Sequence, residues 1–171
     1  YNYFENKDDL FQAILTPVTT AVDEVFERLE GGVPTSSAIL HNYEFEESRL
    51  NAIVAFVDQH RDYLRLLLLR AEGSAMRNYR DKLIERYADI CARSAASMTA
   101  DGQVPVSRFF LCNVCSFYLN TLEEMLKHDL LREEMEEYGE ELLRYSFFGF
   151  MALLNPKLER SQQASASLSL S

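Results

Sequence analysis

Hydrophobic residues recur at steps of three and four along most of the chain, which is the period of an amphipathic α-helix. Asn6 is placed to cap the first turn of the first predicted helix, and Gly31 and Gly32 are placed to end it. Pro17 lies well inside, and we expect a kink there because the proline ring removes one backbone hydrogen bond. The apolar positions of this helix are Leu10, Ile14, Val18, Val22, Val25 and Leu29.

The same periodicity predicts further helices along the rest of the chain. Residues 31–43 hold glycine, proline and serine and are predicted to form a loop. Four consecutive leucines at positions 66–69 leave no polar face on their helix, so we expect other helices to surround it. The predicted helices begin near Leu50, Tyr63, Met76, Val106 and Arg132, and the last one ends near Leu154.

Composition favours an all-α fold built as one main domain. The 171 residues include only six glycines and four prolines, which is few for a loop-rich all-β protein. Asp and Glu outnumber Lys and Arg by 27 to 17, and the formal charge of -10 repels phosphate groups. Any nucleic-acid-binding surface is therefore expected largely outside these residues. Residues 109–122 form the most apolar uncharged run, which is too short and too polar to span a bilayer, so no membrane partner is expected.

The candidate chemistry of the chain is sparse. The cysteines Cys91, Cys112 and Cys115 are odd in number and stand among apolar residues, which favours a reducing cytoplasm over a secreted disulfide framework. Cys112 and Cys115 have the spacing of a metal or redox pair, but no neighbouring His or Cys pair supplies further ligands, so core packing is preferred. No Ser/His/Asp grouping, phosphate-binding glycine loop or dinucleotide fingerprint occurs. The sequence predicts no cofactor, no metal and no enzymatic activity.

The first ten residues resemble a known junction between two helices. They carry the pattern Tyr1-x-Tyr3-Phe4-x-x-Lys7-x-Asp9-Leu10. This pattern is similar to the segment of tetracycline-repressor (TetR) family transcription regulators in which the DNA-recognition helix ends and the next helix begins. The predicted downstream helices also resemble that family in number, order and length. The resemblance implies an N-terminal helix-turn-helix unit, most of which precedes Tyr1, and then a divergent helical domain for ligand binding and dimerisation.

The resemblance implies a division of the chain and a set of DNA contacts. Residues 1–5 would end the helix-turn-helix unit, residues 6–156 would form the ligand-binding and dimerisation domain, and the tail 157–171 is expected to be disordered because it lacks bulk to pack. Tyr1 and Tyr3 match positions that touch or adjoin DNA phosphates. Lys7 matches a phosphate contact, with a solvated lysine as the alternative.

The helix predicted from Val106 has two different apolar faces, because successive side chains turn by about 100° around the axis. One face suits a dry contact between helices and carries Leu111, Cys115, Tyr118, Leu122 and Met125. The other mixes aromatic and hydrogen-bonding groups, as expected where a small molecule binds, and carries Phe110, Asn113, Phe117, Asn120 and Thr121. In the TetR family the second-last helix lines the ligand pocket with one face and forms the dimer with the other, so the resemblance implies both roles here.

The last predicted helix ends in an aromatic run, residues 145–151, which would favour aggregation if it were exposed on a monomer. In TetR-like proteins the last two helices of each subunit form a four-helix bundle across a twofold axis. An ordinary core within one chain is the alternative. The dimer interface implied by the resemblance contains Leu111, Cys115, Tyr118, Leu122, Met125, Phe147, Phe148 and Met151.

Two earlier helices supply additional candidate pocket residues. These are Tyr63, Leu67 and Arg70 from the leucine-rich helix, and Tyr79, Tyr87 and Cys91 from the long helix that follows it. The tyrosines have a simpler interpretation, because tyrosines at helical spacing often fill a core with the hydroxyl at its edge. Arg70 also has a simpler interpretation, as a member of a surface ion pair.

The preferred hypothesis is a ligand-responsive regulator of the TetR type, most often a repressor in that family. It would be a cytoplasmic homodimer that binds operator DNA through the N-terminal unit and a hydrophobic or amphipathic small molecule in the helical domain. Ligand binding would favour one spacing of the two DNA-binding units, with the helix from Lys7 to Glu30 as the lever. The alternative is a helical protein-interaction module that uses its apolar last helices and has no small-molecule pocket.

Overall fold

A computed structural model contains six α-helices, and no β-strand occurs among the residues that it describes. The structure describes residues 3–32, 39–71, 74, 76, 78–99 and 102–154, with side chains in the second segment from residue 42 onward. The predicted all-α class is confirmed for these segments. The helices are α1 (Lys7–Gly31), α2 (Ile39–Gln59), α3 (Arg61–Leu69), α4 (Tyr79–Met98), α5 (Arg108–Lys127) and α6 (Arg132–Leu154).

Most helix boundaries follow the predicted ones, with one correction. α2 begins at Ile39 and not near Leu50, so residues 39–43, which were predicted as part of a loop, are helical. The glycine, proline and serine residues that predicted the loop all precede Ile39, and the loop was extended too far beyond them. α1 ends at Gly31, as predicted, and it is one helix through Pro17, where a kink was expected. The predicted disordered tail, residues 157–171, lies outside the described residues.

Side chains close several helix ends. The Asn6 Oδ1 atom accepts a hydrogen bond of 2.9 Å from the backbone N–H of Asp9 at the start of α1. Ser107 accepts one of 3.1 Å from the N–H of Phe110 at the start of α5. Each cap satisfies a backbone donor that has no partner within the helix, which explains why the helices begin at these residues.

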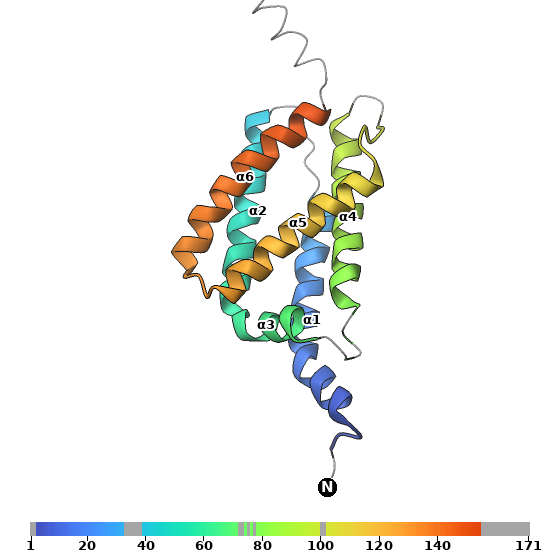
Figure 1. Cartoon of the computed structure of the whole chain (residues 1–171). Coiled ribbons are helices and arrows are strands. Elements are labelled where there is room, and N and C mark those ends of the chain that lie inside the picture. The colour runs from blue at the N-terminus through green and yellow to red at the C-terminus, as the bar shows by residue number, and fades with distance from the viewer. Residues whose placement is uncertain are drawn as a thin grey trace, which may run out of the picture.

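The helices form two packed pairs joined by the remaining two (Figure 1). α6 packs along α2, and α5 packs along α4. α3 crosses one end of the molecule and contacts α1, α2, α4 and α5. α5 and α6 meet at a turn near that end and spread apart toward the other end, while the N-terminal half of α1 projects beyond the other helices (Figure 1).

Acidic and basic side chains hold the turn between α5 and α6 in place. Asp129 adopts a positive φ of 55°, a left-handed conformation that aspartate tolerates better than most residues. Its Oδ1 atom accepts hydrogen bonds from Arg61 at 2.9 Å and Arg65 at 2.6 Å, both on α3. The hydrogen bonds from Arg65 and Arg61 lower the pKa of Asp129. Arg65 also donates to the carbonyl oxygen of Leu126 at 2.9 Å, so α3 binds both the backbone and the side chain of this turn.

A second set of charged contacts joins α1 to α4. Arg86 on α4 donates to Glu30 at 2.9 Å and to Asp23 at 2.8 Å, both on α1. Its guanidinium group also lies over the ring of Phe26, 4.8 Å from the ring centroid. These contacts attach the C-terminal half of α1 to α4.

The buried residues form three clusters. The largest gathers at the α3 end, where Leu15, Leu64, Leu126 and Met135 come from α1, α3, α5 and α6. The other two lie between α4 and the last two helices, around Ala95 with Phe147 and around Ala88 with Leu111. No helix of the described segments is long and apolar enough to cross a membrane.

The core at the α3 end should depend strongly on Leu126, which is 1% exposed. We expect Leu126→Ala to lower the free energy of unfolding by about 2–5 kcal/mol, because it removes buried apolar atoms and leaves a cavity. Urea denaturation followed by circular dichroism measures this. Leu131→Ala makes the same chemical change at a side chain that is 63% exposed, and it should cost less than about 0.5 kcal/mol. Equal losses in the two variants would contradict the described packing.

Candidate functional site

All six helices contribute to one cavity with a volume of about 350 Å³. Most of the side chains that line it are apolar, and they come from both helix pairs and from α1 and α3. The volume and the apolar wall are typical of sites that bind a small organic molecule.

The polar side chains of the wall gather toward one end of the cavity. Asn42, Glu46 and Arg49 line it from the first half of α2, and the start of α2 meets the end of α4 where Asn42 lies 3.8 Å from the sulfur of Met98. Ser94 lines the same end from α4. The opposite end, next to α3, has an apolar lining that includes Val57, Leu64, Leu68, Leu83, Met125 and Met135.

Glu46 and Arg49 are the only charged residues among the described lining residues. Arg49 Nη1 donates to Glu46 Oε1 at 2.8 Å, one helical turn apart, and the two side chains are only 14% and 28% exposed respectively. The Arg49 guanidinium also lies 5.4 Å from the centroid of the Phe45 ring. Burial raises the pKa of Glu46 and outweighs the opposing effect of Arg49, so negative charge is already disfavoured at this position.

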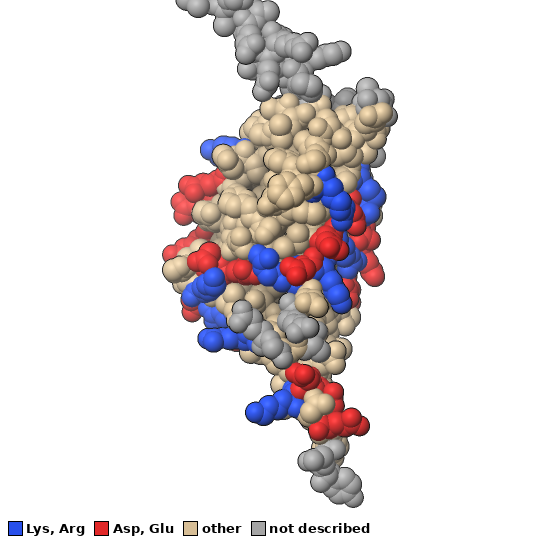
Figure 2. Space-filling model, turned by 45° about the vertical axis from the view of Figure 1, so that its right-hand side comes forward, with Lys and Arg blue, Asp and Glu red and all other residues tan. Residues whose placement is uncertain are grey.

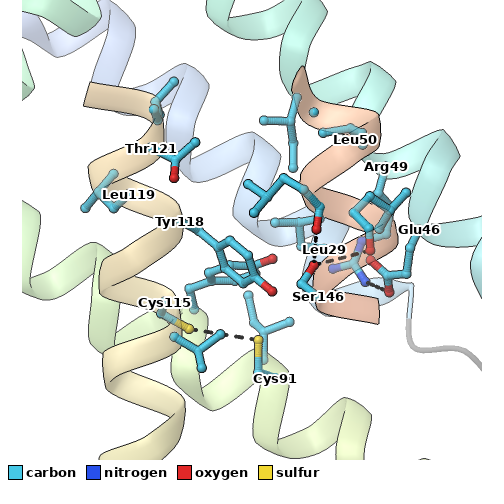
Figure 3. Close-up of a pocket in the computed structure, with 18 of the residues that line it drawn as sticks. Leu29, Glu46, Arg49, Leu50, Cys91, Cys115, Tyr118, Leu119, Thr121 and Ser146 are labelled. Atoms are coloured by element: carbon cyan, nitrogen blue, oxygen red, sulfur yellow. Dashed lines mark hydrogen bonds and ion pairs between the residues drawn. The ribbon is translucent and has the colours of Figure 1, made fainter. Parts of the chain in front are cut away.

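Two phenols and a hydroxyl lie across the cavity from that ion pair. Figure 3 shows Tyr118 of α5 pointing toward Ser146 of α6, with Glu46 and Arg49 of α2 beyond it. Ser146 donates to the carbonyl oxygen of Leu142 at 2.7 Å. Burial raises the pKa of both Tyr118 and Tyr87. Both phenols therefore stay protonated and can donate a hydrogen bond at neutral pH.

Two cysteine thiols face each other in the cavity wall. The sulfur atoms of Cys91 on α4 and Cys115 on α5 lie 4.0 Å apart, within hydrogen-bonding distance for sulfur. The contact with Cys91, followed by burial, raises the pKa of Cys115, so this thiol remains neutral. Cys112, the other half of the Cys-x-x-Cys motif, does not line the cavity. No group of three or more His, Cys, Asp or Glu side chains among the described residues could hold a metal ion.

Of the residues predicted to line a pocket, the structure brings Tyr87, Cys91 and, from the mixed face of α5, Thr121 to the cavity wall. Tyr63 is 47% exposed on α3, Leu67 is buried in the core, and Arg70 is exposed at the end of α3. On α5, Phe110 and Phe117 are 36% and 46% exposed. Asn113 and Asn120 are also exposed. Asn113 donates a hydrogen bond to the carbonyl oxygen of Phe109, and Asn120 accepts one from Arg80. These four residues of α5 face away from the cavity.

The residues predicted for the dimer interface line the cavity wall instead. Among them, only Phe148 lies outside the lining set, and it is 52% exposed and stacks on Tyr43 with ring centroids 5.8 Å apart. The face of α5 that was expected to form the dimer therefore supplies most of this helix's part of the cavity wall. Both faces carry aromatic residues, so hydrophobicity alone did not identify the inner one. The predicted dimer residues that line the cavity are Leu111, Cys115, Tyr118, Leu122, Met125, Phe147 and Met151.

The outward face of α5 carries exposed aromatic side chains. Phe109 is 80% exposed, in addition to Phe110 and Phe117. Tyr145, Phe148 and Leu153 are exposed on α6. Figure 2 shows a broad uncharged area over the upper part of the molecule, above a band of acidic and basic side chains. Exposed aromatic area on this scale is typical of an interaction surface.

The predicted DNA-contacting residues lie at the projecting end of α1. Tyr3 is 87% exposed and Lys7 is exposed at the first position of the helix. Tyr1 lies outside the described residues.

The polar residues of α2 were missed by the sequence reasoning, although a signal was present. Asn42, Glu46, Arg49, Ile53 and Val57 lie on one face of the helix because they follow each other at steps of three and four. The stripe begins polar and ends apolar. Such a change along a single buried face indicates a helix that crosses from a polar to an apolar environment.

No protein-family model, curated protein or solved structure matches this chain.

Tyr79, a predicted pocket residue, packs against the core instead, and its hydroxyl is buried without a hydrogen-bond partner among the described residues. Burial raises the pKa of Tyr79 to about 12. We expect Tyr79→Phe to raise the free energy of unfolding by about 1 kcal/mol, because an unsatisfied buried polar group costs roughly 1–3 kcal/mol.

Thermal and urea denaturation measure this change. Tyr145→Phe removes the same hydroxyl from a side chain that is 78% exposed and should leave stability unchanged. A less stable Tyr79→Phe variant would show that the hydroxyl does have a partner.

Proposed function

We propose that this chain is the ligand-binding and dimerisation part of a TetR-like transcription regulator, most simply a repressor. The observation that carries the proposal is the apolar cavity with a polar end between the six helices. A core without such a cavity would have favoured the interaction module.

The cavity has the properties required for ligand binding. Its volume of about 350 Å³ suits a drug-sized molecule, and its few polar groups can orient that molecule. Protein interiors are closely packed and rarely hold spaces much larger than a water molecule, so a space of this size supports a binding role. A bound ligand would fill apolar space that is otherwise costly to leave empty.

The position of α1 supports coupling between the cavity and DNA. The C-terminal half of α1 lines the cavity with Val22, Phe26 and Leu29, and the N-terminal half projects from the bundle (Figure 1). Leu10 and Ile14 are 42% and 41% exposed on that projecting half, which suits a helical DNA-binding unit packed against it. A ligand that changes how α1 packs would therefore shift the DNA-binding unit.

The outward aromatic face of α5 supports a homodimer. We assign the interface to its phenylalanines and to the exposed aromatic residues of α6, in place of the buried residues that the resemblance implied. A twofold dimer contact that packs this face of α5 against the same face of a second copy would cover the exposed aromatic residues of both α5 and α6. The interaction module remains the second candidate, because the same face could bind a different protein.

Filling the cavity with a larger side chain should prevent compounds from binding in it. We expect Thr121→Trp to abolish the thermal stabilisation produced by any compound that stabilises the unmodified chain, because the indole enters the space beside the α5 wall (Figure 3). A compound present at 100 times its dissociation constant should stabilise the unmodified chain by about 2.7 kcal/mol. Differential scanning fluorimetry against a panel of apolar and amphipathic compounds measures this.

Glu124→Trp is the matched control, since Glu124 lies on the same helix but outside the cavity and is exposed. Compounds should bind this variant as they bind the unmodified chain. The same compounds should then change operator affinity in the protein that includes its N-terminal DNA-binding unit. Unchanged operator affinity would overturn the regulator hypothesis while leaving the ligand site intact.

The aromatic face of α5 should hold the dimer together. We expect the unmodified chain to sediment as a dimer and Phe117→Glu to sediment as a monomer, because each copy would place a charge in an apolar contact. Tyr63→Glu introduces the same charge at a similarly exposed position on α3 and should remain a dimer. A monomeric unmodified chain, or a dimeric Phe117→Glu variant, would argue against this interface.

A further inference from the structure

We propose, on the basis of the ligand-binding function above, that the cavity selects an amphipathic molecule with an uncharged polar head. The head would lie between the Glu46–Arg49 pair and Tyr118, and the apolar part would extend toward α3.

The direction of the ligand follows from how polarity changes along the cavity. Glu46 and Arg49 line one end, and Tyr118 faces them with Ser146 between the two sides (Figure 3). Leu64 and Leu68 of α3 line the other end, which is apolar. A molecule that is polar at both ends would leave one of its ends without hydrogen-bond partners, and that is costly in an apolar environment.

The neutral charge of the head follows from the balance of charge in the wall. Glu46 and Arg49 neutralise each other through their 2.8 Å contact, and no other charged residue is among the described lining residues. An anionic head would meet Glu46, where burial already disfavours negative charge, and a cationic head would meet Arg49. Either charge would lose its water without gaining an unpaired opposite charge, whereas a neutral head loses less.

The same end of the cavity offers suitable hydrogen-bonding groups for a neutral head. Tyr118 is a protonated phenol that can donate, and Arg49 has further N–H groups besides the one bound to Glu46. Glu46 has a second carboxylate oxygen that can accept. A hydroxyl group, which both donates and accepts, matches this set without disturbing the ion pair.

Three probes with the same biphenyl body test the inference. They are 4-phenylphenol, which is neutral at pH 7, biphenyl-4-carboxylate, which is anionic, and 4-phenylbenzylamine, which is cationic. The aromatic body suits a wall that contains Phe26, Tyr87 and Phe147. Isothermal titration calorimetry should give a dissociation constant for the phenol at least tenfold lower than for either charged probe.

Variants of the ion pair should change this preference in opposite directions. Glu46→Gln leaves the Arg49 charge unbalanced, so the carboxylate should gain at least tenfold relative to the phenol. Arg49→Gln leaves Glu46 unbalanced, so the amine should gain by a similar factor. Glu124→Gln breaks the exposed Lys127–Glu124 pair, which has the same spacing along a helix, and should leave the preference unchanged. Ratios between probes are compared within each variant, so a change in stability does not affect them.

Each outcome separates the inference from the proposed function. Tightest binding of a charged probe to the unmodified chain would overturn the neutral head and leave the ligand cavity standing. Variants that keep the original preference would show that the head lies away from Glu46 and Arg49 and would also overturn the inference. Failure of all three probes to bind would count against both the inference and the cavity as a ligand site.

Discussion

The divergence of α5 and α6 from their shared turn is the constraint on which the rest of the structure depends. Asp129 holds that turn through Arg61 and Arg65, and Arg65 also binds the backbone of Leu126. Because the two helices spread apart from this point, α5 packs on α4 and α6 packs on α2 instead of on each other (Figure 1). The space between the two pairs is the cavity. Two consecutive helices packed side by side would have closed it.

The two charged residues of the cavity wall are paired with each other within one helix. A charge on an apolar wall is costly unless an opposite charge accompanies it. Glu46 and Arg49 meet this condition within one turn of α2, so their partnership does not depend on how the helix pairs are spaced. A change in the spacing between the helix pairs would therefore leave this ion pair intact.

The same chain carries apolar groups on both sides of α5, and the two sides have different surroundings. Leu111 and Cys115 are buried within the chain, whereas Phe109 and Phe117 are exposed to solvent. Helical periodicity separated the two faces but could not decide which one points inward, since both carry large apolar side chains. The polar face of α2 was overlooked for a related reason. Glu46 and Arg49 resemble ordinary solvated residues until the position of α6 and α5 across from them is known.

The sequence by itself determined the all-α class, the number of helices and most of their ends, because apolar period, caps and glycine breaks act over a few neighbouring residues. It also placed Tyr87 and Cys91 on a face that reaches the cavity. Tertiary structure alone decided which side of α5 faces inward and which polar groups share the cavity. The physical reason is that the rotation of a helix about its own axis depends on the helices packed against it, and those contacts join residues far apart in the sequence.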